Sequence, residues 1–237
     1  MATIYNDILN AKNANQKLLA ILIDPEKVDV ETIELLSEKI KKSPATLIFI
    51  GGSSFESVQI DTIISQLKKH ISLPIILFPG NPNQISSLAD GILFLSLISG
   101  RNPDYLIEHQ INAVPLLNKT KLEIISTGYI LVESGKQTAV ERVSLTKPLA
   151  ISNPNYILQT AQAGEMLGNK LIYLEAGSGA DLTIPENIIS LVAQNISIPL
   201  IVGGGIRSIS NIEKTYQAGA DLVVIGTAFE NNFDFFE

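Results

Sequence analysis

The chain has 237 residues, of which 46% are hydrophobic and 17% are charged, and it contains no Cys and no Trp. This composition is typical of a compact globular protein and excludes the disordered and fibrous classes. Without Cys, the chain has no disulfide framework, thiolate zinc site, iron–sulfur cluster or Cys nucleophile. The formal charge of -7, from 17 basic and 24 acidic residues, argues against a nucleic-acid partner.

The sequence gives no sign of a membrane span or of export. No segment approaches the roughly 18 consecutive apolar residues that a membrane-spanning helix needs. The N-terminal segment lacks the basic stretch and apolar core of a signal peptide, since its first apolar run, 18–23, is too short. We therefore expect a soluble, cytoplasmic protein.

Short apolar runs recur along the whole chain and predict strands that are buried on both faces of a parallel sheet. These runs lie at 18–23, 47–50, 75–78, 92–95, 129–132, 171–174, 200–202 and 222–225. Segments with helical spacing separate most of them, at 30–41, 56–69, 154–167, 185–195 and 208–218. Repeated βα units in a chain of this length predict one α/β domain, a (β/α)8 TIM barrel over residues 1–237.

Two connections depart from a regular barrel. Residues 79–90, which begin with Pro-Gly-Asn-Pro, are too few for a full helix, so we expect a short loop in place of the helix after the third strand. The polar segment 134–152 is long for a βα connection, and we expect an active-site loop or a short helix there.

Glycine-rich turns after the seventh and eighth strands predict a phosphate site. The sequences are Gly203-Gly204-Gly205 and Gly226-Thr227, and these two loops are the usual phosphate-binding position in barrels of this kind. Ser178 and its flanking glycines add a third loop of the same type after strand six. Arg207 follows the first turn, where an exposed residue at a helix start is the simpler interpretation.

Tyr173 and Glu175 lie two residues apart at the end of the sixth predicted strand, so both face the same side of the sheet. A carboxylate beside a phosphate site is a candidate general base for a substrate hydroxyl. Spacing alone leaves a second interpretation equally open, in which Glu175 caps a helix or anchors a loop.

Asp24 and Ser53 end the first two predicted strands, which are neighbours in a barrel. A carboxylate and a hydroxyl with water and substrate phosphate oxygens would suit Mg²⁺. The same residues also fit helix caps, because Asp24 precedes Pro25 and Ser53 precedes Glu56 by three positions. His70 and His109 have no metal-binding spacing and are interpreted as surface or helix-end residues.

The strand-end motifs together resemble the geranylgeranylglyceryl phosphate synthase family, which includes bacterial heptaprenylglyceryl phosphate synthases. The motifs run in order from strand one to strand eight: Asp24-Pro25-Glu26-Lys27, Gly51-Gly52-Ser53, Phe78-Pro79-Gly80-Asn81-Pro82, Ser99-Gly100-Arg101-Asn102-Pro103, Tyr129 to Glu133, Tyr173-Leu174-Glu175-Ala176-Gly177-Ser178-Gly179-Ala180, Gly203-Gly204-Gly205-Ile206-Arg207 and Gly226-Thr227-Ala228-Phe229-Glu230.

The resemblance implies a Mg²⁺-dependent phosphoglycerol geranylgeranyltransferase, an enzyme of an early step in ether-lipid biosynthesis. Such an enzyme joins sn-glycerol 1-phosphate to a polyprenyl diphosphate through an ether bond and releases diphosphate. Geranylgeranyl diphosphate is the first choice of prenyl donor, and the sequence leaves C20 against C35 open. The resemblance also implies a barrel without its third helix, a homo-oligomer (dimer or hexamer), and a lipid product compatible with peripheral membrane contact.

Carried over by position, the resemblance assigns roles to single residues. Mg²⁺ would be held by Asp24 and Ser53, and Glu175 would act as the base with Tyr173 beside it. Arg101 is our own candidate for a diphosphate contact. Glycerol 1-phosphate would be bound by Tyr173, Leu174, Glu175, Ala176, Gly177, Ser178, Gly179, Gly204, Gly205, Gly226 and Thr227.

Two other functions fit a barrel with a phosphate site. One is an isomerase or lyase that acts on a phosphorylated small metabolite, and the other is a non-catalytic phosphate-binding barrel. Against the isomerase or lyase, Asp24 is the single good candidate for a second acid or base opposite Glu175. The non-catalytic barrel predicts binding without turnover.

Overall fold

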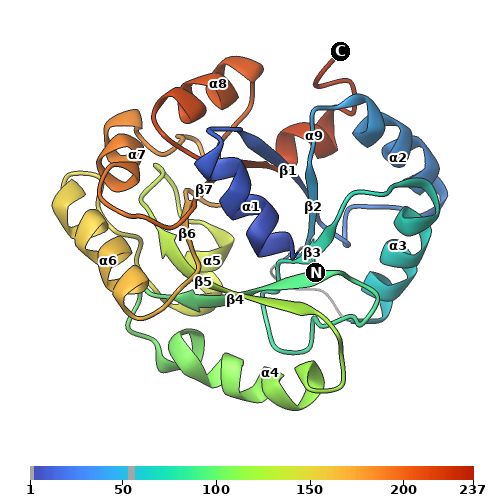
Figure 1. Cartoon of the computed structure of the whole chain (residues 1–237), viewed down its shortest axis with the longest axis horizontal. Coiled ribbons are helices and arrows are strands. Elements are labelled where there is room, and N and C mark those ends of the chain that lie inside the picture. Colours follow the sequence, from blue (N-terminus) through green and yellow to red (C-terminus); the bar gives the residue numbers. More distant parts are fainter. Residues whose placement is uncertain (1–2, 53–56) are drawn as a thin grey trace.

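Eight parallel strands form a closed barrel in the computed structural model, which describes residues 3–52 and 57–237 (Figure 1). Each strand pairs with the next in the chain, and β8 closes the barrel on β1. The strands are β1 (Leu18–Ile23), β2 (Leu47–Ile50), β3 (Ile75–Leu77), β4 (Gly91–Leu97), β5 (Glu123–Leu131), β6 (Leu171–Glu175), β7 (Leu200–Gly203) and β8 (Leu222–Ile225). This arrangement confirms the predicted (β/α)8 barrel.

Strand residues alternate between two separate apolar layers, as the period of two in a β-strand requires. Ala20, Phe49 and Tyr173 belong to the layer inside the barrel. Ile21 and Leu174 belong to the outer layer, where the strands pack against the helices. Both layers are buried, which explains why the strands have continuous apolar sequences.

The helices surround the barrel, and those expected from helical spacing are present. These are α2 (Ile33–Lys42), α3 (Ser57–His70), α6 (Pro154–Met166), α7 (Glu186–Ala193) and α8 (Ile209–Gln217). A 3-10 turn (Val30–Thr32) precedes α2, and a π-helical turn (Asp104–Glu108) precedes α4 (His109–Leu117). Three further helices were not predicted from the sequence: α1 (Ile4–Asn13), α4 and the terminal α9 (Thr227–Asn231).

Helix α1 covers the amino-terminal end of the barrel, and it crosses the middle of the barrel in Figure 1. Its Ile8 and Ala11 pack against the inner layer. The carboxylate of Glu123, at the start of β5, accepts hydrogen bonds from the backbone N–H groups of Ile4 (2.6 Å) and Tyr5 (3.0 Å) and so caps the helix. A ligand must therefore enter from the opposite end.

The connection from β3 to β4 contains no helix, as expected for residues 79–90. Side chains hold this short loop: the Gln84 carbonyl oxygen accepts from Gly80 N–H (2.7 Å), and the Asp90 carboxylate accepts from Ile75 N–H (2.9 Å). No helix of the 79–90 connection therefore covers the outside of the barrel between β3 and β4.

The segment 134–152 contains the short helix α5 (Ala139–Ser144), which is capped by the side chain of Thr138. Val140 and Val143 of this helix reach the carboxyl end of the barrel. Within the two described ranges, the structure contains no helix long and apolar enough to cross a lipid bilayer.

Candidate active site

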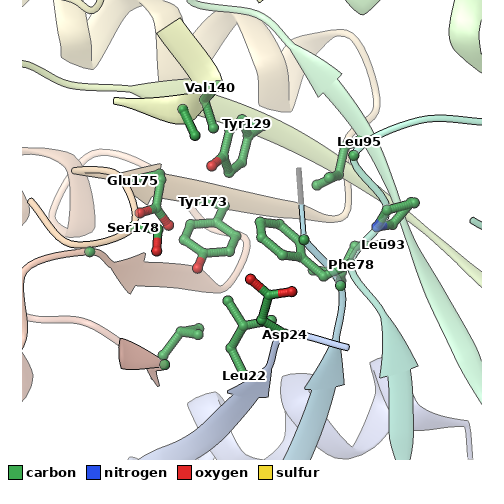
Figure 2. Close-up of a pocket in the computed structure, with 18 of the residues that line it drawn as sticks. Leu22, Asp24, Phe78, Leu93, Leu95, Tyr129, Val140, Tyr173, Glu175 and Ser178 are labelled. Atoms are coloured by element: carbon green, nitrogen blue, oxygen red, sulfur yellow. The ribbon is translucent and has the colours of Figure 1, made fainter. Parts of the chain in front are cut away.

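A cavity of about 690 Å³ opens at the carboxyl ends of the strands. Of the eleven residues expected to bind glycerol phosphate, eight line it: Tyr173, Glu175, Ser178, Gly179, Gly204, Gly205, Gly226 and Thr227. In Figure 2, Glu175 and Ser178 lie on one side of this cavity, Phe78, Leu93 and Leu95 lie on the other, and Asp24 lies between them. One cavity thus joins a polar region to an apolar one.

The other three expected residues, Leu174, Ala176 and Gly177, do not line the cavity. Leu174 and Ala176 point into the outer apolar layer and do not line the cavity, because they alternate with Tyr173 and Glu175 along the chain. Gly177 donates its backbone N–H to Oε1 of Glu175 at 2.6 Å. Direct contact between a substrate and the side chain of Leu174 or Ala176 is therefore not favoured.

Tyr173 and Glu175 are both buried, and both point into the barrel. The Tyr173 hydroxyl is near enough to the Glu175 carboxylate to influence its pKa, but it has no partner in good hydrogen-bond geometry among the described residues. A buried polar group without a partner is uncommon in folded proteins, so this hydroxyl is available to a ligand. The Glu175 carboxylate faces the cavity, as the functional interpretation requires, and its bond from the Gly177 N–H also anchors the loop after β6.

The buried position of Glu175 changes its acidity. Burial raises the pKa of Glu175 from 4.5 to about 7, against the opposing effects of the Tyr173 hydroxyl and the Gly177 N–H. A carboxylate with a pKa near neutrality can accept a proton from a substrate and release it again without a large energetic cost. The environment therefore suits a general base.

Gly203 makes room for this pair, a role that the sequence analysis did not assign. It is the residue of β7 that pairs with Glu175. A Cβ atom on Gly203 would lie 2.4 Å from the Tyr173 hydroxyl oxygen and 2.9 Å from Oε2 of Glu175. Glycine is required there by space.

The glycine loops after β6, β7 and β8 form the polar side of the cavity. Gly204 and Gly205 have positive φ angles of +86° and +69°. Turns of this kind direct backbone N–H groups toward a common centre and create a concave anion site. Ser178 and Thr227 extend the site from the neighbouring loops, with their hydroxyl oxygens 3.4 Å apart. The arrangement supports the predicted phosphate site.

Asp24 lies at the end of β1 with its side chain 21% exposed, on the cavity wall. Its Oδ1 accepts from Glu26 N–H (3.1 Å), and its Oδ2 lies 3.4 Å from the Lys27 ammonium. Ser53, the second expected magnesium ligand, lies outside the described residues.

Asp24 fits Mg²⁺ as a single protein carboxylate ligand. Residues 3–52 and 57–237 contain no group of three or more His, Cys, Asp or Glu side chains that could form a complete protein cage for a metal ion. Mg²⁺ is commonly held by one or two carboxylates together with water and substrate phosphate oxygens. Asp24 fits as that protein carboxylate, in a site completed by the substrate.

Comparison with known proteins identifies the family of this chain. A model described as the PcrB family matches residues 10–236. The chain belongs to the PcrB family. Curated relatives extend this result, since the geranylgeranylglyceryl phosphate synthase of Flavobacterium johnsoniae is 61% identical over all of this chain and 98% of its own length. The synthase of Zunongwangia profunda is 53% identical over 98% of each chain. The resemblance found in the strand-end motifs is thus confirmed.

A solved structure of a relative matches the same fold. It is the crystal structure of (S)-3-O-geranylgeranylglyceryl phosphate synthase from Thermoplasma acidophilum in complex with its substrate sn-glycerol 1-phosphate. The two chains superpose with a TM-score of 0.93 at 33% identity, over 99% of this chain and 96% of that one.

The apolar side of the cavity in this PcrB-family protein is lined by a set of residues that we call the apolar limb: Ile85, Leu93, Leu95, Ala113, Val140 and Val143. These residues come from the 79–90 connection, β4, α4 and α5. Three packed rings lie between Glu175 and the Leu93 and Leu95 side of the apolar limb (Figure 2). Their ring centroids are 5.5 Å apart for Phe78 and Tyr173 and 5.3 Å apart for Tyr129 and Tyr173. The cavity becomes apolar beside the connection that lacks a helix.

His109 lies at a helix end, as one of its two expected positions, but it also contributes to the cavity. It is the first residue of α4, but it is half-buried and lines the cavity rather than lying on the outer surface. Its ring makes an edge contact with Tyr105, with centroids 4.6 Å apart. No motif in the sequence indicated this position, because α4 itself was not predicted. His70 ends α3 as expected.

Arg101 does not line the cavity of this PcrB-family protein. Its side chain is exposed, with Nη1 donating to the Gly100 carbonyl (2.5 Å) and Nη2 donating to the Tyr156 hydroxyl (2.8 Å). This placement gives no support to the predicted diphosphate contact. Arg207 is also exposed, as expected, but it lines the cavity and donates to the carbonyl oxygen of Ala180 (2.8 Å).

Proposed function

We propose that this protein is a prenyltransferase that joins sn-glycerol 1-phosphate to a polyprenyl diphosphate through an ether bond, with release of diphosphate. The observation that carries the proposal is the position of Glu175, a buried carboxylate between a glycine-lined anion site and an apolar limb. Membership of the PcrB family and the bound glycerol 1-phosphate of the Thermoplasma acidophilum relative support it.

The phosphate group of glycerol 1-phosphate binds in the loops that follow β6, β7 and β8. Backbone N–H groups at Gly204 and Gly205 and the hydroxyl groups of Ser178 and Thr227 supply hydrogen-bond donors for its oxygens. The unpartnered Tyr173 hydroxyl binds the glycerol moiety. These contacts fix the free terminal hydroxyl near Glu175 and so reduce the entropic cost of the reaction.

Glu175 accepts the proton of that hydroxyl as its oxygen bonds to C1 of the prenyl chain. The Gly177 N–H orients the carboxylate by its hydrogen bond to Oε1. Burial, which raises the pKa of Glu175 to about 7, makes the carboxylate a better proton acceptor than an exposed one.

Asp24, together with Ser53 as the family motif implies, would hold Mg²⁺, which would neutralise charge on the departing diphosphate. In Figure 2, Asp24 and Ser178 lie on opposite sides of the Tyr173 ring. The prenyl diphosphate therefore lies with its charged end toward Asp24 and its C1 toward Glu175.

The apolar limb accommodates the prenyl chain. Its aliphatic residues exclude water from the reacting carbon, where an allylic cation would otherwise be captured by water. We propose geranylgeranyl diphosphate as the donor, in line with the names of the relatives. The alternative donor is a C35 prenyl diphosphate. We also predict a homo-oligomer (dimer or hexamer), a cytoplasmic location, and peripheral contact with a membrane for release of the lipid product.

The experiment that tests the function measures turnover of radiolabelled sn-glycerol 1-phosphate with prenyl diphosphates from C15 to C35. We expect a lipid-extractable product that forms with Mg²⁺, is lost with EDTA, and does not form from sn-glycerol 3-phosphate. Binding of glycerol phosphate without any such product would contradict the proposal and favour the phosphate-binding isomerase, lyase or non-catalytic barrel.

A further inference from the structure

Among the described residues that line the cavity, the Lys and Arg side chains lie at two separate places. Arg207 lies beside the loop after β6, where its guanidinium donates to the backbone carbonyl of Ala180. Lys27 lies at the end of β1, beside Asp24. Both substrates of the proposed reaction are anions, and the two cations lie at the two ends where the proposal puts the phosphate and the diphosphate.

Lys27 is held within reach of the expected metal-binding carboxylate. Its backbone N–H donates to the Asp24 carbonyl (3.0 Å) and closes a tight turn. Its Nζ lies 2.9 Å from Oε2 of Glu230 and 3.4 Å from Oδ2 of Asp24. The side chain is 46% exposed, so the ammonium is also accessible to a ligand in the cavity.

Glu230 fixes this arrangement from a distant part of the sequence. It belongs to α9, and its side chain is 13% exposed. While Oε2 pairs with Lys27, Oε1 accepts from the backbone N–H of Asp24 at 3.1 Å. One carboxylate therefore positions both the turn that carries Asp24 and the ammonium of Lys27.

Charge determines what Lys27 does when the diphosphate binds. Asp24 and Glu230 alone would repel the diphosphate from this end of the cavity, since like charges at close range are unfavourable. A lysine ammonium has three donors, and it already uses two directions toward carboxylates. A small rotation of its flexible side chain brings it to a diphosphate oxygen.

We propose that Lys27 is a further catalytic residue that contacts the diphosphate of the prenyl donor, and that Glu230 is the positioning residue that holds it. This proposal rests on the proposed function. In the reaction, the C1–O bond of the donor breaks and its electron pair stays on the diphosphate oxygen. The Lys27 ammonium donates a hydrogen bond to that oxygen without transferring its proton. The new C1–O bond forms to the glycerol oxygen, whose proton goes to Glu175.

The competing interpretation is structural, since the pair of Lys27 and Glu230 also joins α9 to the end of β1. A matched control for that interpretation is Lys39. Its ammonium likewise lies between two carboxylates, those of Asp234 and Glu237, but it does not line the cavity.

The test measures binding of inorganic pyrophosphate by calorimetry, with and without Mg²⁺, to the wild type and to Lys27→Met, Lys27→Gln, Lys27→Arg and Lys39→Met. A hydrogen bond to a charged group contributes about 1.5–3 kcal/mol, so removal of the ammonium should weaken pyrophosphate binding at least about tenfold. Binding of glycerol 1-phosphate should stay unchanged. Lys27→Arg should keep part of the affinity, and Lys39→Met should keep all of it.

Glu230→Gln separates the positioning role from the binding role. We expect its KM for the prenyl diphosphate to rise and its KM for glycerol 1-phosphate to stay the same, with wild-type Tm within a few degrees. Unchanged pyrophosphate affinity in folded Lys27→Met and Lys27→Gln, or no pyrophosphate binding by the wild type, would overturn the proposal. Failure of the proposed function gives a different result, namely pyrophosphate binding that depends on Lys27 but no prenyl product from the wild type.

Discussion

Tyr173 and Glu175 leave the same face of β6, and both end inside the barrel beside Gly203 of the next strand. The pairing of Glu175 with Gly203 gives both side chains the space that a Cβ atom would occupy. Burial on this face raises the pKa of Glu175 to about 7 and leaves the Tyr173 hydroxyl without a partner among the described residues. The chemistry of the site follows from this one relationship.

Replacement of Glu175 with Gln should abolish the reaction but leave substrate binding in place. The amide keeps the shape of the carboxylate but cannot accept the proton, and general-base catalysis typically contributes about 10²–10⁴ in rate. We therefore expect kcat to fall at least about 100-fold, as measured by steady-state turnover. The Kd for glycerol 1-phosphate should change little. A variant that keeps wild-type kcat would show that Glu175 is not the base.

The activity should depend on pH through the same residue. Burial raises the pKa of Glu175 to about 7, and the base acts when deprotonated. The value of kcat/KM should rise about tenfold per pH unit below neutrality and level off at higher pH, because this parameter reports groups of the free enzyme. The residual activity of Glu175→Gln should lack this inflection. This control distinguishes ionisation of Glu175 from ionisation of the substrate phosphate. A profile that is flat from about pH 5.5 to about pH 9 would contradict the assignment.

The free energy of unfolding should fall with rising pH, in the direction opposite to the change in kcat/KM. The folded-state pKa of Glu175 is raised from 4.5 to about 7, so the folded protein holds a proton that the unfolded chain has released between these values. The free energy of unfolding should therefore fall as pH rises through this range, by about 3 kcal/mol in total. Urea titrations of wild type and Glu175→Gln should differ little at about pH 4.5 and differ most above about pH 7, with the Gln variant more stable.

Replacement of Gly203 with Ala should damage the site by crowding it. The new methyl group would meet the Tyr173 hydroxyl at 2.4 Å and displace two buried side chains. Such overpacking costs about 1–3 kcal/mol of stability, and the displaced base should lower kcat at least about tenfold. Gly168→Ala is the control, since Gly168 has a φ of +91° and a Cβ atom added there would have no neighbour within 4 Å. It should lose stability and keep its activity.

A larger side chain in the apolar limb should shorten the prenyl chain that the enzyme accepts. Ala113 on α4 is buried and lines the cavity, so Ala113→Phe fills space that the chain would occupy. We expect kcat/KM to fall most for the longest accepted diphosphate and least for C15, in a competition assay with product analysis. Val114→Phe, on the exposed side of the same helix, should leave the preference unchanged. Equal losses for all chain lengths would place the prenyl chain elsewhere.

Much of the fold was predictable from the sequence, because strands buried on both faces require continuous apolar runs. Strand β5 was the exception: it begins at Glu123, six residues before the apolar run, where Glu123 caps α1 and Ser126 bonds to Asn169. Helix α4 was missed because it contains Pro115 and is apolar on several sides, so it lacks the usual amphipathic period.

The candidate site was predicted where its residues are close in the sequence. Tyr173, Glu175 and the glycine turns belong to single strand ends, and the period of two fixes their direction. The contact of Glu230 with Lys27 joins residues 203 positions apart, and no local pattern shows it. The place of His109 and of Arg101 depends on how α4 and α6 pack, which spacing alone does not determine.

The most direct test of the proposed reaction follows one oxygen atom. Glycerol 1-phosphate labelled with ¹⁸O in its free terminal hydroxyl is incubated with geranylgeranyl diphosphate, Mg²⁺ and the protein, and the lipid product is analysed by mass spectrometry. If the glycerol hydroxyl attacks C1, the ¹⁸O is retained in the ether bond and the released diphosphate is unlabelled. An ether without the label, or prenyl alcohol as the sole lipid product, would contradict attack by the glycerol hydroxyl at C1.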